Sequence, residues 1–122
     1  MSSSESELLR FAASSFPSVW ALELLLVLKS ETRVWSQAEL IASLRASEVV
    51  VTRALEALVI AGLVSEEPAG ATYMPVSKLA ADCVDQLEDL YRARPNAVRR
   101  AIVSAGTSSA TAFADAFKLG KD

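Results

Sequence analysis

The chain has 122 residues, which suits a single domain that buries roughly two thirds of its unfolded surface. A net charge of −3 and a pI of about 5.0 exclude a protein held to nucleic acid by its overall charge, so any such contact must be local. One cysteine, no histidine and no glycine-rich phosphate loop exclude an internal disulfide and predict a protein that is not an enzyme, with no catalytic residue, metal or cofactor.

The N-terminal extension, residues 1–16, lacks the basic start and apolar core of a signal peptide. A short helix is expected over Glu5–Ala13, although its apolar content is too small for it to stand alone. The most apolar run of the chain, Val19–Leu28, is too short to span a bilayer. We therefore expect a cytoplasmic protein with no membrane partner.

The next helix is expected over Val19–Lys29, and Pro17 suits a first helical position, where its missing N–H costs nothing. It has almost no polar face, so other elements should cover it on most sides, which makes it the central helix of the fold. Trp20 lies within this apolar run and Trp35 lies beside a second one. Both indole side chains are therefore expected in the core.

Two further helices with a short turn between them are predicted after Trp35. Ser36 and Glu39 form a capping box, so one helix begins at Ser36. Ser47 followed by an acid is a second start signal, and the helix that it opens runs to Gly62, which suits the left-handed residue that ends a helix. Two short runs, 63–66 and 71–74, then surround a loop with proline and glycine and predict a β-hairpin.

The run Val51–Leu58, VTRALEAL, and the run Ala61–Val64, AGLV, resemble the recognition helix and wing entry of winged helix-turn-helix regulators of the MarR-like type. The resemblance implies a mainly α fold with a small β-hairpin wing, and a short strand before residue 36 that pairs with the wing. The winged helix-turn-helix core would span residues 17–76, between the N-terminal extension and C-terminal helices over 77–122, in one domain of residues 1–122.

The same resemblance implies a transcriptional regulator that binds double-stranded DNA, with the helix from Ser47 in a major groove. Arg53 would then reach a guanine or a phosphate, while serine and threonine hydroxyls donate to backbone oxygens. The predicted DNA-binding residues are Ser36, Gln37, Ser47, Val49, Thr52 and Arg53.

Charge and pattern keep a second interpretation open. Residues 36–76 contain two arginines, Arg45 and Arg53, against five glutamates, and two of these acids lie at the wing tip. A helical wheel of the second helix turns these residues inward: Val51, Leu55, Leu58, Val59 and Gly62. The opposite, outer side, which contains Arg53, is then mostly apolar. The alternative is therefore an acidic winged-helix module that docks another protein and does not bind DNA.

Beyond the hairpin, helices are expected over Ser77–Ala93, with a largely acidic outer face, and over Asn96–Ala105. Four arginines without an acid among them lie around the junction of these two helices: Arg92, Arg94, Arg99 and Arg100. They suit either additional phosphate contacts or a corner in which they pair with acids of the preceding helix.

A last helix is expected after residue 107, and its apolar stripe contains Phe113 and Phe117. The short helices bring more apolar side chains than the core unit can cover, so a homodimer is predicted with these phenylalanines in its interface. The same stripe could instead close a core within one chain.

Overall fold

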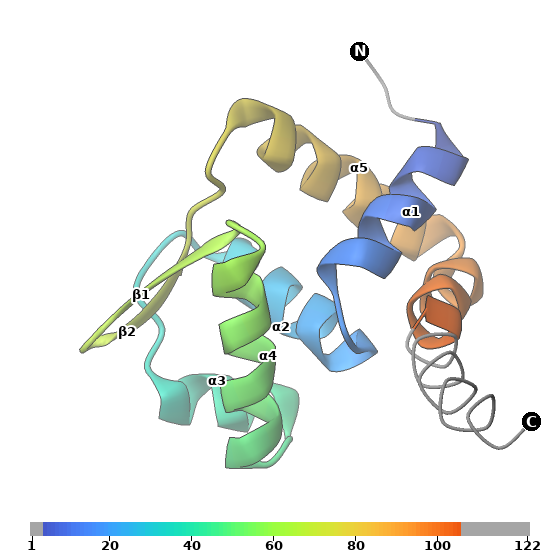
Figure 1. Cartoon of the computed structure of the whole chain (residues 1–122). Coiled ribbons are helices and arrows are strands. Elements are labelled where there is room, and N and C mark those ends of the chain that lie inside the picture. The colour runs from blue at the N-terminus through green and yellow to red at the C-terminus, as the bar shows by residue number, and fades with distance from the viewer. Residues whose placement is uncertain (1–3, 106–122) are drawn as a thin grey trace, which may run out of the picture.

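The computed structural model describes residues 4–105 of the chain (Figure 1). Its elements are α1 (Glu5–Ser15), α2 (Val19–Ser30), α3 (Gln37–Leu44), α4 (Glu48–Ile60), β1 (Val64–Glu67), β2 (Gly70–Tyr73) and α5 (Lys78–Ala93), followed by a helical segment over residues 95–105. The prediction of a mainly α fold with a small β-hairpin is confirmed. The predicted last helix, with Phe113 and Phe117, lies outside the described residues.

Helix α2 is the central element, as its apolar sequence predicts. It packs against α3, α4 and β2, while α1 packs against α5 on the other side of the molecule (Figure 1). Its buried residues are Ala21, Leu22, Leu24, Leu25 and Leu28. Lys29, near its C-terminal end, pairs with Asp85 and Glu88 of α5 at 3.1 and 2.7 Å, which ties the two helices together.

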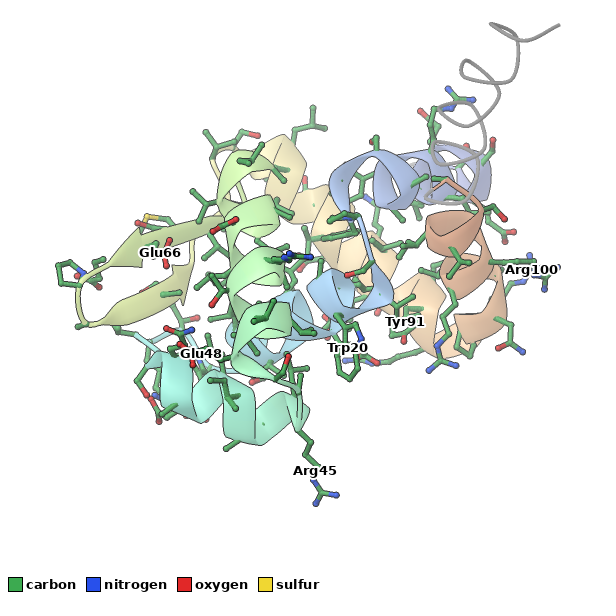
Figure 2. All side chains as sticks on the ribbon, turned by 60° about the horizontal axis from the view of Figure 1, so that its bottom comes forward. Trp20, Arg45, Glu48, Glu66, Tyr91 and Arg100 are labelled. Atoms are coloured by element: carbon green, nitrogen blue, oxygen red, sulfur yellow. The ribbon has the colours of Figure 1, made fainter. Side chains whose placement is uncertain are left out.

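The two tryptophans differ in their burial. Trp35 is 7% exposed, and its Nε1–H donates to the carbonyl oxygen of Glu31 at 3.1 Å, so its predicted core position is confirmed. Trp20 is 44% exposed, so the prediction that it lies in the core is wrong. It stands in the first turn of α2, one residue before the buried Ala21, where α1 and α2 meet at 102° and leave its ring at the surface (Figure 2).

Strands β1 and β2 form an antiparallel hairpin in the register Val64 to Tyr73 and Glu67 to Gly70. Trp35 pairs with the hairpin at a single residue. Its N–H donates to the Ala71 carbonyl oxygen at 2.8 Å, and its carbonyl oxygen accepts from the Ala71 N–H at 2.9 Å. Gly70 lies against this bridge so closely that a Cβ there would collide with the Trp35 carbonyl oxygen. The predicted pairing of the segment before residue 36 with the hairpin is therefore present as a single bridge.

Serine caps set the starts of the helices. The hydroxyl oxygens of Ser36, Ser47 and Ser77 each accept from an N–H three residues further on, at 3.1 to 3.2 Å, and Ser36 and Glu39 complete the predicted capping box. The cap of α2 is Ser18, so Pro17 lies outside the helix and not at its first position. Gly62, with φ of 77°, follows α4 in the left-handed conformation, as predicted.

No single helix within residues 4–105 is long and apolar enough to cross a membrane. Helices α1 and α2 reach that length and apolar content only when taken together, and this pair is bent by 102°.

Candidate nucleic-acid interface

The six predicted DNA-binding residues come together at the start of α3 and along the first half of α4. Gln37 in the first turn of α3 donates its Nε2–H to the Thr52 hydroxyl of α4 at 2.8 Å, which fixes the two helices at this surface. Ser36 and Ser47 are the caps of the two helices, and each cap uses the oxygen as an acceptor. Their O–H groups therefore remain free to donate outward.

Arg53 is exposed and has no ion pair or hydrogen bond within residues 4–105. It stands between two shallow hollows. One, of about 280 Å³, is lined by Glu48, Val49, Thr52 and Glu56 as well as Arg53. The other, of about 270 Å³, is almost wholly apolar and is lined by Pro17, Ser18, Trp20, Val50 and Ala54 together with Arg53.

Arg45 is a cation at this surface that was not among the predicted contact residues. It ends α3 in the left-handed conformation, with φ of 55°, and its side chain extends away from the helices (Figure 2). No ion pair or hydrogen bond holds its guanidinium among the described residues. Its place in the short turn between two predicted helices is the one signal in the sequence that could have pointed to it.

Acids of α3 and α4 weaken the positive potential of this surface. Hydrogen bonds from the Arg33 guanidinium and then from the Ser36 N–H lower the pKa of Glu39 from 4.5 to about 2, so this carboxylate stays ionised at the start of α3. Glu48 and Glu56 line the same hollow as Arg53. Arg33 adds no free cation, because it pairs with Glu39 at 3.0 Å and its guanidinium lies 3.8 Å from the centre of the Trp35 ring.

Of the four arginines predicted as possible phosphate contacts, Arg92 lies in the last turn of α5 and the other three follow this helix. Figure 2 shows Arg100 at the end of the molecule away from the hairpin. Arg92 pairs with Glu88 at 3.2 Å and with Asp89 at 3.7 Å, so for this residue the predicted pairing with acids of the preceding helix is confirmed. Arg94 instead pairs with Glu5 of α1, and the Arg99 Nε–H donates to the Tyr91 hydroxyl at 3.2 Å. Only Arg100 is left without such a partner within the described residues, so three of the four predicted phosphate contacts are already engaged within the chain.

Comparison with family models, curated proteins and solved structures finds no match to this chain. The MarR-like resemblance therefore stays a prediction. Within residues 4–105, no group of three or more acidic, cysteine or histidine side chains could hold a metal ion.

The second half of α4 exposes apolar side chains. Ile60 is 87% exposed and Val59 is 37% exposed, which corrects the prediction that Val59 turns inward. Ala54 takes an inward place on the helix together with Val51, Leu55 and Leu58. The apolar outer side predicted for this helix is therefore present, and no element within residues 4–105 covers Ile60 or fully covers Val59.

Proposed function

We propose that residues 17–76 form a winged helix-turn-helix and that the first half of α4 binds double-stranded DNA. The order of elements supports this proposal: a helix, a bridging residue, two helices joined by a short turn, and a hairpin. The observation that carries it is the Gln37–Thr52 hydrogen bond beside the unpaired Arg53. This bond gathers the polar groups of α3 and α4 on one outer surface.

Each group has a distinct role in the proposed complex. With the start of α4 in a major groove, Arg53 donates to a guanine edge or to a phosphate. Gln37, Ser47 and Thr52 donate to backbone oxygens, and Arg45 in the turn reaches the phosphates at the edge of the groove. Transcriptional regulation is the proposed use of this contact.

The charges predict that such binding is weak for one copy of the chain. Arg45 and Arg53 are the only cations in residues 36–76, so a single copy neutralises about two phosphates by counterion release. The five glutamates of the same segment oppose the approach of a polyanion. Binding should therefore be measurable only at low salt or with a second copy.

A second candidate function is docking of another protein at the same surface. It is favoured by Val49, which is 59% exposed next to Glu48, where an apolar side chain gains little from contact with a phosphate backbone. The acids and the apolar residues would suit a partner with basic and apolar side chains. This candidate gains support if duplex DNA does not bind at low salt.

Fluorescence anisotropy with a nonspecific DNA duplex tests the first proposal. Arg53→Ala should reduce the free energy of binding by about 1–3 kcal/mol, since it removes the central cation of the surface. Arg10→Ala is the matched control, because Arg10 is also exposed and has no ion pair or hydrogen bond within residues 4–105 but lies in α1, outside the candidate interface. Equal losses from the two substitutions, or no binding by the unmodified protein, would contradict the assignment.

A further inference from the structure

One edge of the hairpin has no partner strand within residues 4–105. Strand β2 lies between β1 and the Trp35 bridge, so β1 is the outer strand of the sheet. The Met74 N–H donates to the Leu63 carbonyl oxygen at 2.9 Å, which sets the alternation of the ladder. Backbone groups of an antiparallel strand point in turn towards its partner and away from it, so those of Val64 and Glu66 point away from β2. No backbone hydrogen bond from another described element reaches them, and they can pair with a further strand.

A hollow of about 710 Å³, which we call the hairpin hollow, lies beside this edge. It is lined by residues 64–66 of β1 and by Val59 near the end of α4. Met74 and Val76, which follow β2, line it as well, and their side chains are 58 and 78% exposed. Exposed apolar groups concentrated in this way mark an interaction surface.

The backbone around the hairpin hollow is fixed by its own hydrogen bonds. The Val76 N–H donates to the Gly62 carbonyl oxygen at 2.8 Å. A Cβ at Gly62 would lie 3.1 Å from a methyl group of Val76, so the two segments pack closely. The edge and the hollow are therefore in place before any partner arrives, which lowers the entropic cost of association.

The charges at this edge are negative. Glu66 and Glu67 of β1 are both exposed, and neither has an ion pair within residues 4–105. Lys78, the first cation after the hairpin in the sequence, does not line the hairpin hollow. Two neighbouring carboxylates favour a basic partner and repel an acidic one. A second copy pairing through the same edge would bring two further acids to it, so the charges do not favour self-association there.

We propose that β1 binds an extended basic segment of another protein, which adds to the sheet as a further strand. The backbone of the segment pairs with the outward N–H and C=O groups of Val64 and Glu66. An apolar side chain of the segment fills the hairpin hollow, and its lysines or arginines meet Glu66 and Glu67. The contact lies at the C-terminal end of α4, and it does not depend on DNA binding, so either proposal can fail without the other.

Fluorescence anisotropy of the full chain with a labelled peptide of alternating valine and lysine tests the contact. An extended peptide of this composition presents apolar side chains on one side and cations on the other. We expect saturable binding, no binding when glutamate replaces lysine, and much weaker binding when the backbone nitrogens are methylated and the N–H donors are lost. No binding of the first peptide at about 1 mM, or equal binding of the glutamate or methylated peptide, would overturn the proposal.

Two substitutions at one position separate the charge from the backbone contact. Glu66→Gln should weaken binding of the valine–lysine peptide by up to about fivefold, because it removes one ion pair at the surface. Glu66→Pro should weaken it further, because it also removes an outward N–H, and an edge strand accepts proline where the N–H faces solvent. Melting curves followed by circular dichroism check that both variants are folded. Equal binding by two folded variants would contradict strand addition.

A third substitution tests the hairpin hollow. Val76→Ser should weaken peptide binding by about tenfold, because two methyl groups no longer contact the partner. Val103→Ser is the matched control, since Val103 is 56% exposed in the segment 95–105, and it should leave binding unchanged. Equal effects of the two substitutions would remove the hollow from the contact. Self-association of the unmodified protein that Glu66→Pro abolishes would assign the edge to a second copy and overturn the proposed partner.

Discussion

The two halves of α4 present different chemistry to the outside although one helix carries both. The first half exposes Thr52 and Arg53 beside the Ser47 cap, with Val49 as its one strongly exposed apolar residue, whereas the last turn exposes only apolar side chains, Val59 and Ile60. The inner side is uniform along the whole helix, with four buried apolar residues: Val51, Ala54, Leu55 and Leu58. The difference teaches that folding constrains one side of the helix, while the other side is free to present polar groups in one half and apolar groups in the other.

The largest effect should distinguish the inner side from the outer side in the last turns of α4. Leu58→Ala removes a fully buried side chain, so it should reduce the free energy of unfolding by about 2–5 kcal/mol in urea titrations. Ile60→Ala changes a residue that is 87% exposed and should cost no more than about 0.5 kcal/mol. A large loss from Ile60→Ala would show that another part of the protein covers this half, and the comparison would fail.

A smaller effect tests the polar half. Ser47→Ala removes the cap of α4 and should cost about 1 kcal/mol of unfolding free energy. Ser77→Ala removes an equivalent cap of α5 and should cost a similar amount. Only Ser47→Ala should also weaken DNA binding, because the Ser47 hydroxyl belongs to the proposed interface. If the two variants bind duplex DNA equally well, Ser47 has only a structural role.

The smallest effect concerns the acid beside the polar half. The folded-state pKa of Glu39 is lowered from 4.5 to about 2, so its ionised form stabilises the fold above pH 4.5, and this contribution is lost as the pH falls towards 2. The melting temperature of Glu39→Gln should therefore lie below that of the unmodified protein at pH 6. Melting curves at pH 6, 4 and 2 should show this gap narrowing with acid, and a gap that stays constant would contradict the assigned pKa.

Local signals explain why much of the fold could be predicted from the sequence. A serine cap acts over three residues, so the starts of α3, α4 and α5 follow from Ser36, Ser47 and Ser77. Gly62 ends α4 for an equally local reason, since its left-handed conformation suits a residue without a Cβ. The candidate interface was largely predicted too, because its residues follow these helix starts.

The predictions that were wrong or incomplete concern side chains whose surroundings depend on how the helices pack. Trp20 is 44% exposed because no element within residues 4–105 covers its ring fully, and no pattern within α2 contains that information. Arg94 pairs with Glu5, which is 89 positions away in the chain, so no pattern of neighbouring residues could predict this pair. Arg45 was missed because the prediction used only the residues at the helix starts, whereas Arg45 ends α3 in the turn before α4.

The salt dependence of binding to a nonspecific DNA duplex tests most directly whether the first half of α4 is the half that binds DNA. Two unpaired arginines predict a slope of log K against log salt of about −2 for each bound copy, about −1 for Arg53→Ala, and an unchanged slope for Ile60→Ala in the last turn. These slopes would support the proposed contact. No binding at low salt, or a slope that Ile60→Ala changes and Arg53→Ala does not, would contradict it.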